Sequence, residues 1–179
     1  MDNSSKKIKD DIHSIAMHEA GHAYAFILSE LSFEFISIDP VLLNLYTSGH
    51  SSGYIFPIQT TCRDEPDLAS SLSPEAFHEC FIADFIIVAG LVAETLHRKG
   101  KFCRQSSKSD VKMLNDNPLM NKPEPFRTKY RSFLLEYTFQ LFKQKEHFIM
   151  IKKIADELLK YRTLSYDQVK EIVQQQVLK

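Results

Sequence analysis

The sequence predicts a mainly α-helical domain with a small β-sheet, which places it in the α+β class. Long segments with helix start and stop signals fill most of the chain, whereas only two short segments are rich in β-branched and aromatic residues. The length of 179 residues, with 44% hydrophobic and 25% charged residues, suits one soluble domain spanning 1–179. We find no internal repeat or low-complexity tract.

The first half of the chain predicts one long helix and two strands. Residues 1–10 form a polar lead that we expect to be flexible, and the first long helix is expected over 12–31. Strands are expected at 33–40, which ends at a turn signal, and at 52–58. These two strands could pair into a small sheet.

The second half predicts four helices. Ser73 followed by Pro74 is a strong helix start, and Gly100 stops that helix after about residue 97. The next helix is expected over 106–116, with Ser107 or Ser109 as its N-cap. Beyond three chain-breaking prolines, two final helices are expected over 126–161 and 166–178.

Charge, cysteine usage and hydropathy exclude several classes of protein. A net charge of −1 gives no general attraction to nucleic acid, and the basic cluster from His97 to Lys108 is expected to be a solvated loop. The three cysteines form no C-x-x-C pair, which favours free thiols and a cytoplasmic location. The apolar run 81–96 is short and contains Asp84 and Glu94, so we expect a core helix rather than a membrane span.

The segment "MHEAGHA" carries the strongest chemical signal in the chain. On a helix, His18 and His22 project from one face, one turn apart, and Glu19 lies beside that face. Two neutral imidazoles so placed can supply two of the four ligands of Zn²⁺, and an adjacent carboxylate can take a proton from the water on the metal. Apolar residues surround the motif, so unpaired histidines there would be costly. We therefore predict a zinc site with Glu19 as the general base.

A catalytic zinc needs one further protein ligand, and spacing alone leaves three candidates. Asp84 and Glu94 lie in the expected core helix, where a carboxylate needs a partner, so either could bind the metal or orient a histidine. Asp110 lies at an expected helix start, where the amide dipoles favour an ionised carboxylate. An ordinary acid at a helix start would look the same.

Five segments in order along the chain carry a resemblance to the peptidase domain of the FtsH-type AAA zinc metalloproteases. They match the zinc motif, the strand pair, the A-G-x-x-A-E helix, the S-x-x-D segment and the closing helix of that family. In this chain they read "HEAGHA" at 18–23, "SIDP" followed by "SGYIFP" at 37–40 and 52–57, "VAGLVAETL" at 88–96, "SSKSD" at 106–110 and "YRTLSYDQVKEIV" at 161–173.

The resemblance implies roles for the acidic residues whose function the sequence spacing left undecided. Asp110 would be the third zinc ligand, Glu94 would orient a ligand histidine, and the fold would be an FtsH-like, mainly helical domain with a small sheet. The chain departs from the family at Thr95, where a second glutamate is usual, and it carries neither a P-loop for ATP nor a transmembrane segment of its own.

The leading hypothesis is a stand-alone, ATP-independent zinc metallopeptidase that hydrolyses flexible or unfolded polypeptides. Gly53 and Tyr54 would offer a strand edge to an extended substrate, although Tyr54 could equally be a core or rim aromatic. The alternative is a zinc-binding regulatory or adaptor protein derived from the same domain, against which the intact Glu19 argues. A homo-oligomer, or an ATPase partner in trans, is compatible with either hypothesis.

Overall fold

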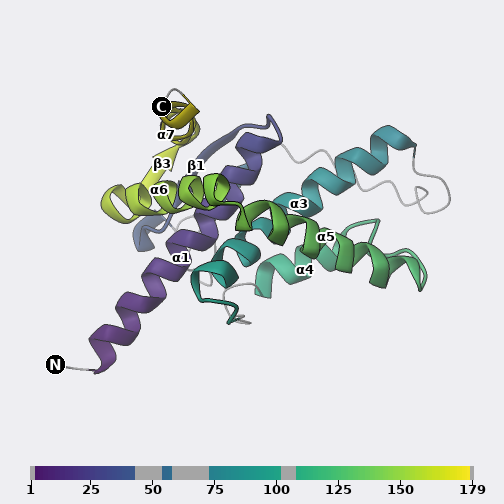
Figure 1. Cartoon of the computed structure of the whole chain (residues 1–179), viewed down its shortest axis with the longest axis horizontal. Coiled ribbons are helices and arrows are strands. Elements are labelled where there is room, and N and C mark those ends of the chain that lie inside the picture. Colours follow the sequence, from purple (N-terminus) through teal and green to yellow (C-terminus); the bar gives the residue numbers. More distant parts are fainter. Residues whose placement is uncertain (1–2, 43–53, 58–72, 102–107, 178–179) are drawn as a thin grey trace.

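The first helix, α1 (Asn3–Leu28), runs through the molecule and contacts most of the later elements (Figure 1). The computed structural model describes residues 3–42, 54–57, 73–101 and 108–177. The helix begins at Asn3 rather than at the expected residue 12, so part of the polar lead is helical. It ends at Leu28 rather than at 31, because Glu30 has a left-handed backbone (φ 57°) and the Leu31 N–H bonds back to the Phe26 carbonyl.

A three-stranded antiparallel sheet packs on α1 with the order β2-β1-β3. The expected strand pair is confirmed as β1 (Phe33–Ser37) and β2 (Tyr54–Pro57), in which Ser37 pairs with Tyr54. The third strand, β3 (Thr163–Ser165), pairs with the other side of β1 and was not predicted. With three residues between two helices, β3 is too short to show an alternating pattern.

The apolar helix α3 (Pro74–His97) follows the prediction at both ends. The Ser73 hydroxyl accepts the Ala76 N–H at 3.2 Å, and beyond the helix Gly100 takes a φ of +86°. By length and composition α3 could cross a membrane, but its central turns pack between α1 and α5 in this fold. The expected core helix is therefore present.

The helix α4 (Lys108–Asp116) brings Asp110 against α3 in its first turn. Of the two N-caps that the sequence offers, Ser109 is already inside the helix and is not the cap. Ser107 lies outside the described residues. The position of α4 matters most for the site, because it carries the third candidate ligand.

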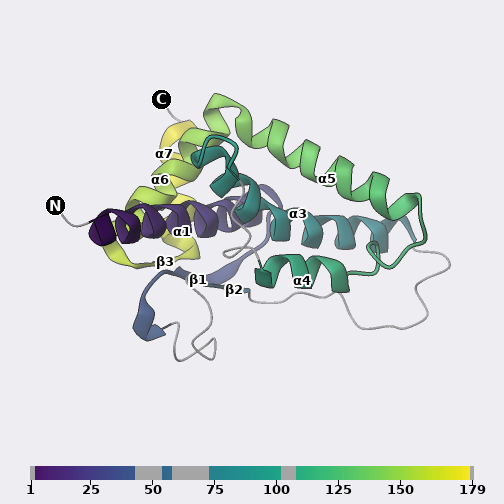
Figure 2. The same ribbon diagram turned by 90° about the horizontal axis from the view of Figure 1, so that it is seen from below.

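The segment expected as one helix over 126–161 is two helices, α5 (Phe126–Lys143) and α6 (Lys145–Tyr161). Gln144 breaks them with an extended backbone (φ −61°, ψ 137°) although it is neither glycine nor proline. The break lets α5 lie along α3 while α6 packs on α1, as the change of direction in Figure 2 shows. The chain closes with α7 (Tyr166–Val177), close to the predicted last helix.

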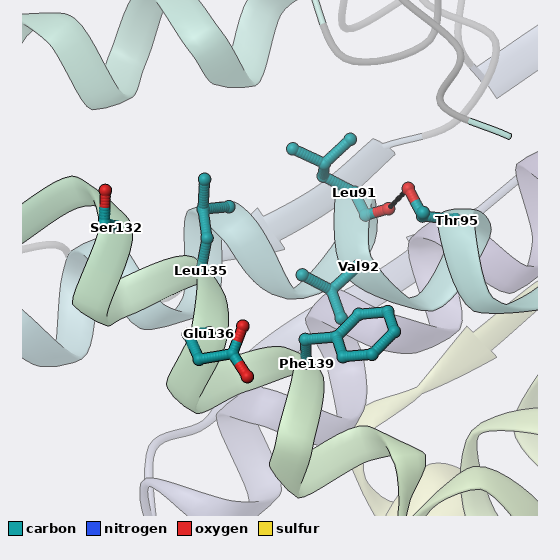
Figure 3. Close-up of a pocket in the computed structure, with 7 residues that line it drawn as sticks. All are labelled: Leu91, Val92, Thr95, Ser132, Leu135, Glu136 and Phe139. Carbon is teal, nitrogen blue, oxygen red and sulfur yellow. Dashed lines mark hydrogen bonds between the residues drawn. The ribbon is translucent and has the colours of Figure 1, made fainter. Parts of the chain in front are cut away.

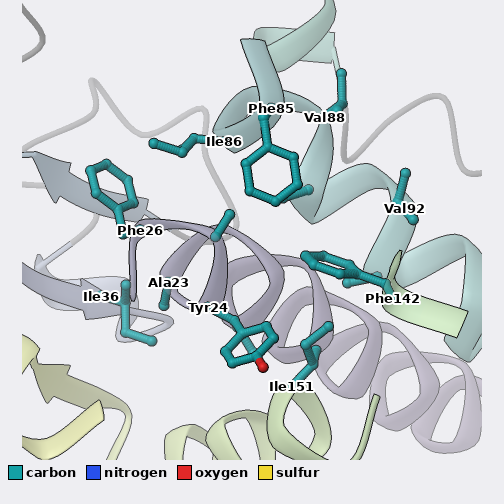
Figure 4. Close-up of a cluster of buried hydrophobic side chains, with 14 of the residues drawn as sticks. Ala23, Tyr24, Phe26, Ile36, Phe85, Ile86, Val88, Val92, Phe142 and Ile151 are labelled. Atoms are coloured by element: carbon teal, nitrogen blue, oxygen red, sulfur yellow. The ribbon is translucent and has the colours of Figure 1, made fainter. Parts of the chain in front are cut away.

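The core lies where α1 meets α3, α6 and the end of α5 (Figure 4). Phe142 is fully buried there, with ring centroids 6.0 Å from Tyr24 on α1 and 6.2 Å from Phe85 on α3. Such aromatic contacts add to the burial of apolar surface that holds the helices together. The core thereby fixes the crossing of α1 and α3, from which the histidines and Glu94 project.

Candidate metal centre

Three side chains from two helices converge on one point beside α3. His18 and His22 come from α1, and Asp110 comes from the first turn of α4. Their ligand atoms all lie within 4.8 Å of one another, and the three residues are buried. The Asp110 Oδ2 atom is 2.8 Å from His18 Nε2 and 3.6 Å from His22 Nε2, and the two Nε2 atoms are 3.0 Å apart.

Both histidine rings present the same nitrogen, Nε2, to that point. The Nδ1 atom of His22 lies 2.7 Å from the Ile86 carbonyl oxygen, which can only accept a hydrogen bond, so Nδ1 is the donor. The Nδ1 atom of His18 faces Glu94 Oε2 at 3.3 Å, again an acceptor. In the neutral rings Nε2 then carries a lone pair, which is the arrangement found when a second contact orients a metal-bound histidine.

The converging atoms fit a divalent cation. With both rings neutral, the two imidazole lone pairs and the carboxylate oxygen are all acceptors, and a cation between them relieves their repulsion. Ligands about 2.0–2.1 Å from a tetrahedral zinc are separated by about 3.3 Å. The three separations of 2.8, 3.0 and 3.6 Å are close to that value. Two nitrogens and one oxygen form a donor set that suits zinc.

Two glycines let the helices come close enough to build this site. A Cβ added at Gly90 of α3 would lie 2.3 Å from His22 Nε2, which is less than any real contact. A Cβ at Gly21 of α1 would lie 2.6 Å from the backbone oxygen of Ala89. Gly90 therefore leaves room for an imidazole, whereas Gly21 leaves room for the α3 backbone.

The electrostatics of the cluster favour positive charge. Burial by itself lowers the pKa of His18, but contacts with Asp110 and Glu94 outweigh it and raise that pKa to about 10. Burial raises the pKa of Asp110, and the contacts with His18 and His22 more than reverse this, so its pKa falls well below the ordinary value. The site thus holds an ionised carboxylate beside the His18 ring, which attracts a proton or a metal ion.

Glu19, the general base that the sequence predicts, is buried beside the two histidines. It is 7% exposed, and its carboxylate interacts electrostatically with both histidines. Burial raises its pKa, an effect that His18 and His22 oppose and that Asp110 and Glu94 reinforce. A carboxyl group with a raised pKa is a better proton acceptor than an ordinary surface glutamate.

The structure shows which of the three carboxylates that sequence spacing left open as the third ligand faces the histidine Nε2 atoms. Asp110 is brought to the Nε2 atoms, and Glu94 contacts the opposite nitrogen of His18 at 3.3 Å. Asp84 is not part of the cluster, because its Oδ2 accepts the Tyr130 hydroxyl at 2.7 Å between α3 and α5. The geometry therefore agrees with Asp110 as the metal-facing acid and with Glu94 as an orienting group.

Sequence reasoning missed Arg98, which was expected in a solvated loop. Its Nε lies 2.9 Å from Glu94 Oε1, and its side chain is 30% exposed. The four-residue spacing of Glu94 and Arg98 on one helix was a signal that could have identified this pair.

The substrate edge expected at Gly53 and Tyr54 is only partly described. Gly53 lies outside the described residues, whereas Tyr54 begins β2, although its side chain is not described. Within the described sheet β2 is an edge strand, and it contacts α1, which carries both histidines. A role for either residue in substrate binding stays a prediction.

A separate groove of about 440 Å³ lies between α3 and α5 (Figure 3). Its lining is mainly apolar, with Leu91 and Val92 on one side and Leu135 and Phe139 on the other. It includes neither the histidines nor Asp110.

Comparison of the chain with models of known protein families and with curated proteins finds no match. The assignment of chemistry to the cluster therefore stands on the residues and their geometry.

Proposed function

We propose that the protein is a zinc metallopeptidase that hydrolyses flexible or unfolded polypeptides. The observation that carries the proposal is the convergence of two Nε2 lone pairs and the Asp110 carboxylate beside a buried glutamate. Three protein ligands that leave a fourth position for water are typical of hydrolytic rather than structural zinc sites.

The roles of the residues follow from their positions. His18, His22 and Asp110 would hold the metal, which when bound supplies a Lewis acid and lowers the pKa of a coordinated water to about 7. Glu19 would accept a proton from the attacking water as its oxygen bonds to the peptide carbonyl carbon, and would pass that proton to the nitrogen of the leaving amine as the C–N bond breaks. The Ile86 carbonyl and Glu94 keep the two rings in the tautomers that this requires.

The resemblance of the sequence to the FtsH-type peptidase domain supports the same reaction. In that family, substrate is a polypeptide, and β2 as an edge strand in the described sheet is compatible with an added substrate strand. We propose that this chain cleaves without ATP, since no phosphate-binding loop occurs in its sequence.

A single substitution at Glu19 tests the proposal. The purified protein should contain one zinc per chain by elemental analysis and should cleave an unstructured peptide in a reaction that chelators stop. Glu19→Gln should keep the zinc and lose activity by at least about 100-fold, because an amide of similar size cannot accept the proton. Glu79→Gln, an exposed glutamate on α3, is the matched control and should change neither quantity.

Two outcomes would contradict the proposal in different ways. Full turnover by a zinc-loaded Glu19→Gln protein would remove Glu19 as the base. A zinc-loaded wild type that cleaves no member of a broad peptide library would favour the zinc-binding regulatory protein instead.

A further inference from the structure

Glu94 is a buried carboxylate held between two partners. It is 1% exposed, and its two oxygens face in different directions. Oε2 is 3.3 Å from His18 Nδ1, and Oε1 is 2.9 Å from Arg98 Nε. Burying an ionised carboxylate is costly unless a positive charge pairs with it. The Arg98 guanidinium therefore helps to hold the Glu94 carboxylate in place and to keep it ionised.

Arg98 is fixed relative to Glu94 by two contacts. It is the C-cap residue of α3, and its backbone N–H donates to the Glu94 carbonyl at 2.9 Å while its side chain reaches the carboxylate. A positive side chain at the end of a helix also interacts favourably with the helix dipole. The guanidinium is thus anchored at the end of α3 on the outer side of the site.

Arg98 adds a positive charge at the edge of the site. Glu19, Glu94 and Asp110 contribute three carboxylates, and the two histidines are neutral when they bind a metal. A divalent cation compensates two negative charges, which leaves one for Arg98. Removing the guanidinium would leave an uncompensated negative charge in a buried site and would free one oxygen of the carboxylate that orients His18.

We propose that Arg98 is a positioning residue that acts through Glu94 on His18 and thereby raises the affinity of the site for zinc. The chain of contacts runs from Arg98 Nε to Glu94 Oε1, and from Glu94 Oε2 to His18 Nδ1, the nitrogen opposite the metal-facing Nε2. This inference rests on the proposed metal site, and it extends that site to a residue 30% exposed at the end of α3.

The test measures zinc affinity directly, by competition with a chromophoric chelator. Loss of a contact that orients a ligand histidine typically weakens metal binding 10–100-fold, so Arg98→Gln should raise the zinc Kd at least about tenfold. Arg98→Lys keeps the charge but not the planar guanidinium and should give an intermediate Kd. Arg127→Gln is the matched control, because it removes an arginine from an exposed Arg–Glu pair at Glu124, and it should leave the Kd unchanged.

A double-mutant cycle distinguishes positioning from a general effect on stability. In a Glu94→Gln background, Arg98→Gln should have little further effect on the zinc Kd, because the group through which Arg98 acts is absent. Circular dichroism of the metal-free variants should show wild-type helix content. A metal-free Arg98→Gln protein that has lost its fold, an unchanged Kd, or equal effects of the substitution in both backgrounds would overturn the proposal.

The result also separates this inference from the proposed function. If the wild-type protein binds no zinc, the metal site itself is wrong, and the positioning role falls with it. If the wild type binds zinc and Arg98→Gln does so equally well, only the role of Arg98 is wrong.

Discussion

At the scale of single residues, the orientation of two imidazoles defines the candidate site more sharply than the distances alone. The Ile86 carbonyl fixes which nitrogen of His22 carries the proton, and Glu94 does the same for His18. When the rings are neutral, the remaining nitrogens converge with Asp110 as acceptors. Asp110 and Glu94 are both acids near one histidine, yet they face opposite nitrogens of its ring.

That difference predicts different effects of removing each acid. Asp110→Ala should remove a ligand and lower the zinc content measured by elemental analysis at limiting zinc by most of its wild-type value. Glu94→Gln should retain most of the zinc when the metal is saturating, because all three ligands remain, although its affinity is lower. The reverse pattern, with zinc lost from Glu94→Gln and kept by Asp110→Ala, would show that the ligand assignment is wrong.

Asp84 is a second buried acid, and it makes stability depend on pH. It is 0% exposed, and burial raises its pKa to about 7, although the bond from the Tyr130 hydroxyl opposes the shift. Because the folded pKa lies above the unfolded value near 4, the folded state binds the proton more tightly. The contribution of protonated Asp84 to the free energy of unfolding is complete below pH 4 and is lost as the pH rises through 7.

We therefore expect Asp84→Asn to flatten the pH dependence of unfolding. Asparagine can still accept the Tyr130 hydroxyl but carries no charge to bury. Between pH 5 and pH 9 the wild type should lose up to a few kcal/mol relative to Asp84→Asn, as measured by urea unfolding at each pH. Asp116→Asn, at an exposed position in α4, is the control. Parallel pH profiles for wild type and Asp84→Asn would contradict the assignment.

At the scale of elements, the close crossing of α1 and α3 makes two glycines respond differently to the same change. At Gly90 the added methyl group meets the end of the His22 side chain, which can rotate away. We expect Gly90→Ala to keep the fold but to weaken zinc binding at least about tenfold, because the displaced ring leaves the Ile86 carbonyl and the metal position. Zinc titration and thermal unfolding of the metal-free protein measure the two effects.

Gly21→Ala is the counterpart on α1. Its methyl group would lie 2.6 Å from both the Ala89 carbonyl oxygen and the Ala93 Cβ. Neither atom can rotate away, so the helices must separate. Overpacking of this kind typically costs about 1–3 kcal/mol, more than the roughly 1 kcal/mol that alanine gains over glycine in a helix. Metal-free Gly21→Ala should therefore unfold at lower temperature than metal-free Gly90→Ala. Equal stability of the two variants, with equal zinc binding, would contradict the close approach.

The elements that the sequence predicted well are those with local signals. Ser73, Pro74 and Gly100 mark the ends of α3 through capping and backbone conformation, which depend on a few adjacent residues. The break at Gln144 has no such signal, because it arises from the packing of α5 on α3 and of α6 on α1. The strand β3 was missed for the same reason, since its pairing with β1 joins segments far apart in the chain.

At the scale of the whole molecule, the same limit applies to the candidate site. His18, Glu19 and His22 lie within one helical turn and a half, so spacing alone predicted that the histidines share a face and that Glu19 lies beside it. Asp110 lies 88 residues beyond His22 in the sequence, and only the packing of α4 on α3 brings it to the histidines. The resemblance to a known peptidase domain indicated Asp110, but no local pattern could do so. Arg98 was overlooked because it falls just beyond the end of α3, in a segment that was expected to be a solvated loop.

A prediction at this scale concerns the state of the substrate. In the purified chain, whose sequence holds no phosphate-binding loop, an extended segment must reach the proposed metal unaided, so its backbone must be free to pair. Unfolded protein and flexible peptides should be cleaved at least about tenfold faster than a stable folded protein of the same sequence, with or without ATP. Comparison of one substrate in its folded and destabilised forms, each with and without nucleotide, measures this. Equal cleavage of both forms, or a need for nucleotide, would contradict the prediction.

The burial of the three converging residues, which are between 4% and 7% exposed, would also govern how fast an ion exchanges. Two of them are fixed on α1 in the core, whereas the third comes from α4, a short helix that packs on α3. An ion would leave when α4 moves aside, so its residence time would reflect the frequency of that local opening rather than the concentration of a competing chelator. The rate of metal exchange would then report how often α4 opens.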